Sequence, residues 1–311
     1  MVKLFIAGHN GMVGNSLVNC FERDLNYKII KRPRKKLNLT SFEQTEDFFR
    51  KNSPDYVIIA AAKVGGIYSN SRYPVEFLLD NLKIQNNLIE ISHRYNVKKL
   101  LFLGSSCIYP KGSEQPIKED YILSSYLEQT NEAYSLAKIT GYKLCSYYRK
   151  QYGMNFFTVM PCNLYGDNDN YHPKNAHALP MLIDRFHKAK IEKLPKVKVW
   201  GSGNPLREYL HANDLARACK NLIELDNLDY DIINVGSGQE ISIADLALKI
   251  KVAVGYKGDI FFDNKYPDGV KRKILDSSRL NELIAWKPSI EISKGISMTY
   301  KNYLSNSNLR R

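Results

Sequence analysis

The fold is decided near the start of the chain, where residues 3–14 read KLFIAGHNGMVG. The apolar run 3–7 predicts a short strand, and a helical pattern begins after the glycine turn that follows it, formed by Gly8, Gly11 and Gly14. Such glycines let the backbone approach a pyrophosphate, which binds at the positive end of the helix. Because the triplet lies between a strand and a helix, it predicts a dinucleotide site more strongly than an ordinary structural turn.

Strands and helices alternate along the sequence that follows. The expected strand 55–62 contains the continuous apolar run 56–62, which is typical of a parallel strand covered on both faces. We expect strands at 3–7, 27–31, 55–62, 98–104 and 155–165, and helices at 74–95 and 131–153. This order predicts an α/β fold, a Rossmann-type doubly wound parallel sheet with a smaller C-terminal substrate-binding domain.

The domain organisation is predicted from a change in composition after residue 166. Residues 167–175 are rich in Asp and Asn, as a loop at a domain edge would be. Further helices are expected at 178–190, 213–225 and 242–254, and further strands at 196–200, 232–235 and 259–263. We expect 1–166 to form the NADP-binding Rossmann domain, with 204–240 returning to it, and 167–203 and 241–311 to form the substrate-binding part.

Composition narrows the class of protein. The net charge of +13 suits a cleft for anionic small molecules, and no nucleic-acid-binding motif is present, so we expect no nucleic-acid partner. The apolar stretch 56–62 is too short to cross a bilayer, and we expect no membrane association. An odd number of scattered cysteines, without metal-ligand spacing, predicts a reducing, cytoplasmic location and no metal: Cys20, Cys107, Cys145, Cys162 and Cys219.

Cationic residues after the second expected strand indicate whether the cofactor is NAD(H) or NADP(H). An NAD-dependent enzyme commonly has Asp or Glu there to bind the ribose hydroxyls. Residues 31–34 read KRPR instead, which suits a 2′-phosphate, so we expect NADP(H) with Arg34 as its leading ligand. A solvated basic turn is the alternative.

Tyr134 and Lys138 are four residues apart in an expected helix and therefore lie on one face. A lysine charge at about 4 Å, in a medium of dielectric constant near 20, contributes roughly 4 kcal/mol. We expect it to lower the pKa of the tyrosine toward the range useful for acid–base catalysis. Ser105 follows the strand at 98–104, at the edge where ligands bind in such sheets. We expect it to form a hydrogen bond with the substrate carbonyl oxygen that the tyrosine protonates.

The chain as a whole resembles the extended short-chain dehydrogenase/reductase superfamily and, within it, the family of GDP-L-fucose synthases. The resemblance covers nearly the whole chain and rests on the glycine turn, the Tyr/Lys pair and these further motifs: AAAKVGG (60–66), LGSSCIYP (103–110), MPCNLYG (160–166), DNYHP (169–173), RFH (185–187), VWGSG (199–203) and PDG (267–269). It implies an oxidoreductase that is also an isomerase in nucleotide-sugar biosynthesis. Such an enzyme inverts C3 and C5 of GDP-4-keto-6-deoxy-D-mannose and reduces C4 with NADPH.

The resemblance also implies roles for individual residues. Cys107 and His177 would be the acid and base of epimerisation, beside Ser105, Tyr134 and Lys138. The cofactor would contact Gly8, Asn10, Gly11, Met12, Val13, Gly14, Arg34, Ala61, Leu103, Gly104, Tyr134, Lys138, Pro161, Asn163, Leu164 and His177. The GDP-sugar would contact Arg185, Trp200, Arg207, Asp268 and Lys273. A homodimer is implied by analogy.

The sequence departs from the family pattern at Asn10, where Arg is common, at Cys162, where Thr is usual, and at Asn38, which replaces an acidic residue. The nearest alternative is a 4-reductase of a GDP-4-keto-heptose, with or without epimerase activity. A 4,6-dehydratase is disfavoured because Ser106 and Cys107 stand where an acidic pair is expected, and an NAD-recycling 4-epimerase is disfavoured by Arg34. A non-catalytic NADPH-binding regulator is disfavoured by the intact Tyr/Lys pair.

Overall fold

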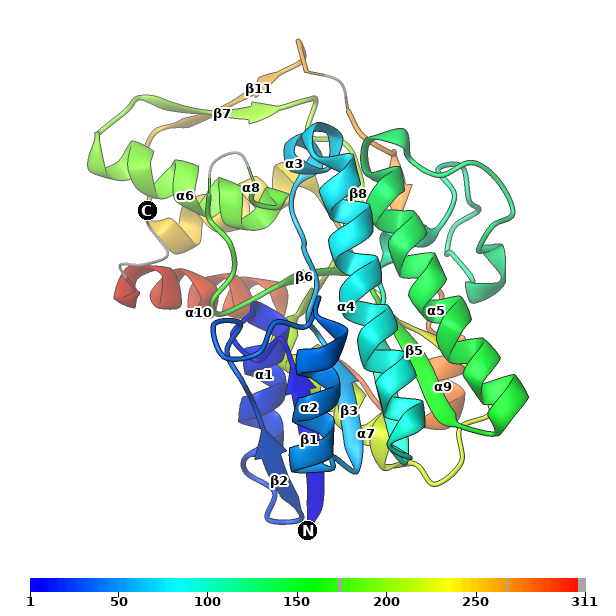
Figure 1. The fold of residues 1–311 in the computed structure, drawn as a ribbon. Coiled ribbons are helices and arrows are strands. Elements are labelled where there is room, and N and C mark those ends of the chain that lie inside the picture. The colour runs from blue at the N-terminus through cyan, green and yellow to red at the C-terminus, as the bar shows by residue number, and fades with distance from the viewer. Residues whose placement is uncertain (173–174, 267, 307–311) are drawn as a thin grey trace.

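A six-stranded parallel sheet forms the centre of the larger part of the molecule (Figure 1). The computed structural model describes residues 1–172, 175–266 and 268–306. The strand order is β2-β1-β3-β4-β5-β9. The chain therefore runs from β1 to its neighbour β2 and then crosses over to β3, which lies on the opposite side of β1. The strands are β1 (Val2–Ala7), β2 (Tyr27–Ile30), β3 (Tyr56–Ile59), β4 (Lys99–Leu103), β5 (Asn155–Pro161) and β9 (Ile232–Val235).

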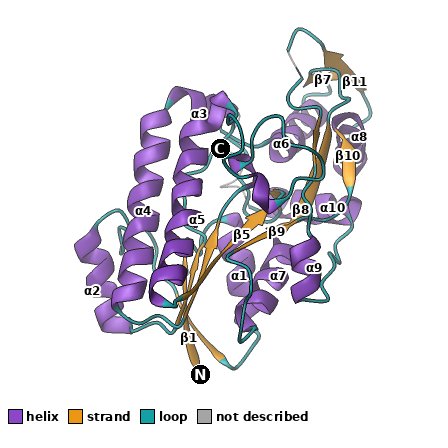
Figure 2. Cartoon of the chain, turned by 90° about the vertical axis from the view of Figure 1, so that its right-hand side faces the viewer, coloured by secondary structure: helices purple, strands orange, loops and turns teal. Residues whose placement is uncertain are grey.

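Helices cover both faces of this sheet, as Figure 2 shows. Alternate residues of β1 enter different cores: Leu4 and Ile6 lie in one, and Phe5 and Ala7 lie in the other. One face carries α1 (Met12–Phe21), α7 (Ala212–Glu224) and α9 (Ser278–Leu283), and the other carries α2 (Phe42–Asn52), α4 (Pro74–Arg94) and α5 (Glu132–Tyr152). The predicted Rossmann-type α/β fold is confirmed.

A smaller part lies beyond the carboxyl ends of the large sheet (Figure 1). It has its own core, which includes Ile183, Phe186, Leu246 and Ile250. Its strands are β6 (Asn163–Tyr165), β8 (Leu206–His211), β10 (Glu240–Ser242) and β12 (Arg272–Lys273), which pair around β8, and β7 (Lys196–Trp200) with β11 (Asp259–Asp263). Its helices are α6 (Ala178–Ile191), α8 (Ile243–Val254) and α10 (Ile292–Ser305), while the short α3 (Ile67–Arg72) follows β3.

The chain leaves the large sheet earlier than the sequence suggests. Residues 155–165 do not form one strand: β5 ends at Pro161, the backbone N–H of Cys162 still donates to Val235, and β6 then pairs with β8. The chain returns to the large sheet through α7 and β9, whereas β8 pairs outside it. The expected domain boundaries stay a prediction. Across the described ranges, no helix has both the length and the apolarity needed to cross a bilayer.

Candidate active site

The glycine turn is a backbone cradle that side chains would fill. Gly8 has φ +89°, and a Cβ atom there would lie 2.6 Å from the backbone nitrogen of Ala61. A Cβ atom on Gly14 would lie 2.1 Å from the carbonyl oxygen of Gly8, whereas one on Gly11 would make only ordinary contact. Gly11 caps α1 without a side-chain hydrogen bond, and the first turn of α1 has no acidic residue. The positive end of α1 thus suits a pyrophosphate.

Among the cations that follow β2, the three at positions 31, 32 and 34 have different surroundings. Lys31 pairs with Glu22 at 2.6 Å. Arg32 donates to the carbonyl oxygen of Lys31, and its guanidinium lies 5.9 Å from the ring centroid of Phe48. Arg34 is exposed and makes no ion pair with any residue that the structure describes. Of the three, Arg34 has the charge most available to a 2′-phosphate.

The other cofactor residues expected from the sequence cluster at the carboxyl ends of neighbouring strands. Because β1, β3, β4 and β5 are parallel and adjacent, these ends meet at one edge of the sheet. The β1–α1 turn contributes Asn10, and the start of α1 contributes Met12 and Val13. Ala61 follows β3, Leu103 ends β4 and is followed by Gly104, Pro161 ends β5, and β6 contributes Asn163 and Leu164.

Lys138 is held deep in the site beside the expected tyrosine. Its side chain is only 3% exposed, and Nζ donates to the carbonyl oxygen of Leu103 at 2.7 Å. Nζ lies 4.6 Å from the ring centroid of Phe102 and 5.8 Å from that of Tyr134. Burial lowers the pKa of Lys138 to about 7.

Tyr134 does not have the lowered pKa expected from its lysine neighbour. Burial raises the pKa of Tyr134, the nearby Cys107 raises it further, and a hydrogen bond with Ser105 opposes the rise. The expectation was wrong because desolvation of the phenolate dominates the shift, and burial also lowers the pKa of the lysine itself to about 7. The same interactions show that Tyr134, Ser105 and Cys107 lie together.

Cys107 lies in a single 3-10 turn, Ser106–Ile108, directly after β4. Ser105 caps this turn by accepting a hydrogen bond from the backbone N–H of Cys107 at 3.3 Å. Ser135, the residue after Tyr134, donates from its Oγ to the carbonyl oxygen of Cys107 at 2.9 Å. The thiol is partly exposed. The chain thus presents a thiol, a serine hydroxyl and a phenol at the end of one strand.

His177 caps α6 at the end of a loop that docks onto the segment after β3. The N–H of Gly66 donates to the carbonyl oxygen of Asn175 at 2.9 Å, and Ser69 donates to the side chain of Asn175 at 2.5 Å. Desolvation by the surrounding protein atoms lowers the pKa of His177, although the residue is exposed at the surface. Within the described part of the chain, His177 has no hydrogen bond to Cys107. Pro173 and Pro267, which belong to the family motifs, lie outside the described residues.

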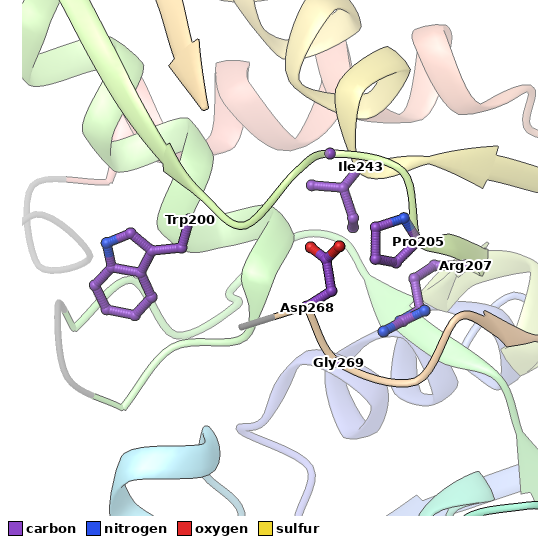
Figure 3. A pocket seen from close by; sticks show the side chains of 7 residues that line it. Trp200, Pro205, Arg207, Ile243, Asp268 and Gly269 are labelled. Atoms are coloured by element: carbon purple, nitrogen blue, oxygen red, sulfur yellow. The ribbon is translucent and has the colours of Figure 1, made fainter. Parts of the chain in front are cut away.

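The residues expected to bind the GDP-sugar gather in the smaller part of the molecule. Trp200, Arg207 and Asp268 line a cavity of about 80 Å³ (Figure 3). Arg207 donates to the carbonyl oxygen of Val270 at 2.6 Å, and burial lowers its pKa. Lys273 on β12 lies opposite Arg207 in the register with β8.

A neighbouring stack extends this group. The guanidinium of Arg185 lies 4.5 Å from the ring centroid of Trp200. Tyr266 stacks on the same indole, with ring centroids 4.7 Å apart and planes inclined by 18°. Sequence reasoning missed Tyr266, and only its position one residue before the PDG motif hinted at it. The stack combines a cation with two aromatic rings, a surface suited to a nucleotide.

Comparison with known proteins identifies the family of the chain. Residues 4–236 match the model of the NAD dependent epimerase/dehydratase family. GDP-L-fucose synthase of Escherichia coli (strain K12) is 46% identical, over 98% of this chain and 97% of that protein.

Two solved structures are similar over nearly the full length. A GDP-L-fucose synthetase from Naegleria fowleri, bound to NADP, has a TM-score of 0.89 at 28% identity, covering all of this chain and 95% of that one. The GDP-mannoheptose C4 reductase MlghC from Campylobacter jejuni, with NADP bound, has a TM-score of 0.86 at 32% identity, covering 97% of this chain and 98% of that one. The chain therefore belongs to the NAD dependent epimerase/dehydratase family.

Proposed function

We propose that this protein is an NADPH-dependent enzyme that converts GDP-4-keto-6-deoxy-D-mannose to GDP-L-fucose. It inverts C3 and C5 and then reduces the C4 ketone. The observation that carries the proposal is the grouping of Ser105, Cys107 and Tyr134 at the end of β4, with Lys138 buried behind them. That group lies at the same sheet edge as the glycine turn.

For reduction, Tyr134 gives its proton to the C4 oxygen while Ser105 donates a hydrogen bond to that oxygen. The glycine turn and Arg34 would hold NADPH, which would supply the hydride for C4 when bound. The raised pKa of Tyr134 keeps the phenol protonated at neutral pH, which is the form required of a proton donor. Lys138 holds the carboxyl end of β4 through the carbonyl oxygen of Leu103.

For epimerisation, protons leave C3 and C5 on one side of the ring and return on the other. The adjacent ketone acidifies these C–H bonds because the enolate oxygen is stabilised by Ser105 and Tyr134. Cys107 and His177 serve as the acid–base pair. The lowered pKa of His177 keeps its imidazole neutral near pH 7 and able to accept a proton.

The GDP moiety binds in the smaller part of the molecule. Arg207 and Lys273 are adjacent on paired strands and provide positive charge for the diphosphate. Arg185, Trp200 and Asp268 provide stacking and hydrogen bonding for the nucleoside.

Product analysis tests the proposal. The enzyme is incubated with NADPH and GDP-4-keto-6-deoxy-D-mannose in D₂O, and the product is identified by NMR. We expect GDP-L-fucose with deuterium at C3 and C5. A C4-reduced product without deuterium would support the proposed reductase activity and rule out the proposed epimerase activity. NADPH oxidation at the background rate would remove both activities.

A second candidate is a 4-reductase of a GDP-4-keto-heptose. It is favoured by the nearly full-length similarity to MlghC, which is named as a GDP-mannoheptose C4 reductase. We propose that residues around 167–176 decide between a six-carbon and a seven-carbon sugar; one of them, Asp169, is a buried carboxyl whose pKa burial raises to about 7. Comparing kcat/KM for the six-carbon and seven-carbon GDP-4-keto sugars decides between the candidates, and a preference of about tenfold or more for the heptose would select the second.

We further propose a homodimer formed through α4 and α5. These helices pack against each other and still expose apolar side chains, among them Leu79, Leu136 and Tyr147. Sedimentation velocity should give about twice the chain mass for the protein. A cytoplasmic location is proposed because all five cysteines are free thiols.

A further inference from the structure

The loop that carries Cys107 is short and has little stability of its own. It consists of one 3-10 turn, in which the backbone N–H of Ile108 donates to the carbonyl oxygen of Ser105 at 3.2 Å. Beyond the turn, Tyr109 donates from its hydroxyl to the side chain of Asn234 at 2.5 Å. Isolated 3-10 turns have poorer hydrogen-bond geometry than α-helices, so contacts from outside the turn must fix Cys107.

Ser135 provides such a contact from α5. A serine inside a helix commonly donates back to the carbonyl four residues earlier, here that of Asn131. Ser135 instead donates to the carbonyl oxygen of Cys107 at 2.9 Å, although the side-chain oxygen of Asn131 lies 3.4 Å from the same hydroxyl. Ser135 is 0% exposed, so no solvent can replace its hydrogen bond. In the described part of the chain, the only other side-chain hydrogen bond to Cys107 comes from Ser105, the residue that caps the turn.

The location of Ser135 in α5 gives this bond a consequence for chemistry. Ser135 directly follows Tyr134, and Lys138 lies one turn later on the same helix. The helix that places the phenol for reduction therefore also places the thiol loop. Removing the Ser135 hydroxyl would leave Tyr134 and Lys138 on α5 and would take away the contact that α5 makes with the Cys107 carbonyl.

We propose that Ser135 is a positioning residue for epimerisation, which fixes the Cys107 thiol relative to the sugar through the Cys107 carbonyl. This inference rests on the proposed role of Cys107. Proton transfer depends steeply on the position of the donor, and a displacement of about 1 Å can reduce a rate by about a hundredfold. Removing the Ser135 hydroxyl should thus impair epimerisation far more than hydride transfer.

Two assays on the NADP-loaded enzyme separate the two steps. Exchange of solvent deuterium into C3 and C5 of the GDP-4-keto sugar, with NADP⁺ present, reports epimerisation without reduction. Oxidation of GDP-L-fucose by NADP⁺ moves hydride from C4 to the cofactor and a proton to solvent, and it is followed by NADPH absorbance. For Ser135→Ala we expect the ratio of the exchange rate to the oxidation rate to fall at least about tenfold.

A chemical probe measures the accessibility of the Cys107 thiol directly. Alkylation of Cys107 by iodoacetamide, measured against Cys20 in the same molecule by mass spectrometry, should become faster in Ser135→Ala because the released turn exposes the thiol. Thr140→Ala is the matched control, since Thr140 also lies on α5 but donates within the helix, to Leu136 at 2.9 Å. We expect Thr140→Ala to leave the ratio of rates and the alkylation rate as in the unaltered protein.

The outcomes distinguish this inference from the function on which it rests. If Cys107→Ala abolishes exchange while Ser135→Ala leaves the ratio of rates unchanged, the inference is overturned and the proposed function survives. If Ser135→Ala lowers both rates equally and lowers Tm, its role is structural and the inference is again overturned. If Cys107→Ala exchanges as fast as the unaltered protein, the proposed role of the thiol fails and the inference fails with it.

Discussion

The Nζ atom of Lys138 donates to the carbonyl oxygen of Leu103 at 2.7 Å, so the lysine is bound to the end of β4 rather than to the phenol of Tyr134. Burial lowers the pKa of the lysine to about 7 and raises the pKa of the tyrosine. The two shifts share one cause, because desolvation disfavours both an ammonium and a phenolate. The pair therefore favours a protonated phenol at neutral pH.

Lys138→Met should flatten the dependence of the free energy of unfolding on pH. The lysine has a pKa of about 7 in the folded protein and about 10.4 when unfolded, so the unfolded chain binds more protons between these values. Stability of the unaltered protein therefore contains a contribution that rises with pH across this window, by at most about 1.4 kcal/mol per pH unit. The methionine variant lacks that contribution.

Urea unfolding at several values between about pH 7 and pH 9.5 measures this difference. The upper limit keeps the titration of unfolded tyrosines, near pH 10, out of the comparison. Parallel curves for the two proteins would mean that Lys138 keeps an ordinary pKa in the folded state.

Tyr134→Phe should reduce kcat for NADPH-dependent ketone reduction by at least about a hundredfold, since general acid catalysis contributes about 10²–10⁴-fold. The change removes only the hydroxyl, so the ring should keep its edge contact with Phe77. Absorbance of NADPH measures the rate. Tyr147→Phe on the exposed surface of α5 is the control, and this variant should reduce the ketone as fast as the unaltered protein does. Full activity of Tyr134→Phe would show that another group protonates the ketone.

Arg34→Ala should raise the KM for NADPH by about 10- to 100-fold and leave the KM for NADH nearly unchanged. The reason is that a hydrogen bond to a charged group contributes about 1.5–3 kcal/mol, and only NADPH has the 2′-phosphate. Steady-state kinetics with both cofactors measure the effect. Arg32→Ala is the control, because Arg32 is already engaged with the carbonyl of Lys31. An equal rise for NADPH and NADH would assign the 2′-phosphate to another residue.

Local sequence signals were sufficient for the large sheet and less so for the rest of the fold. Continuous apolar runs and the glycine turn identified β1, β3 and β4, because these features depend on neighbouring residues. Helix α2 was missed, although Ser41 and Gln44 have the spacing of a capping box and Ser41 accepts from the backbone N–H of Gln44. The separation of β6 from β5 was not predictable, since it depends on pairing with the distant β8.

The site shows the same division between local and tertiary information. The positions of Ser105, Tyr134 and Lys138 follow from strand ends and helix periodicity, and these three do lie together. The direction of the pKa shift of Tyr134 does not follow, because it depends on how completely the folded chain buries the phenol. The stacking of Tyr266 on Trp200 is likewise a contact between two segments far apart in sequence.

Gly14→Ala should abolish NADPH binding and lower Tm. A methyl group at this position would lie 2.1 Å from the carbonyl oxygen of Gly8, so the turn and α1 must separate to accommodate it. Gly112→Ala is the matched control, since a Cβ atom at Gly112 meets nothing within 4 Å. Quenching of protein fluorescence by NADPH and thermal unfolding measure both variants. If Gly14→Ala bound NADPH as tightly as Gly112→Ala, the close approach of α1 to the turn would not be what forms the pyrophosphate cradle.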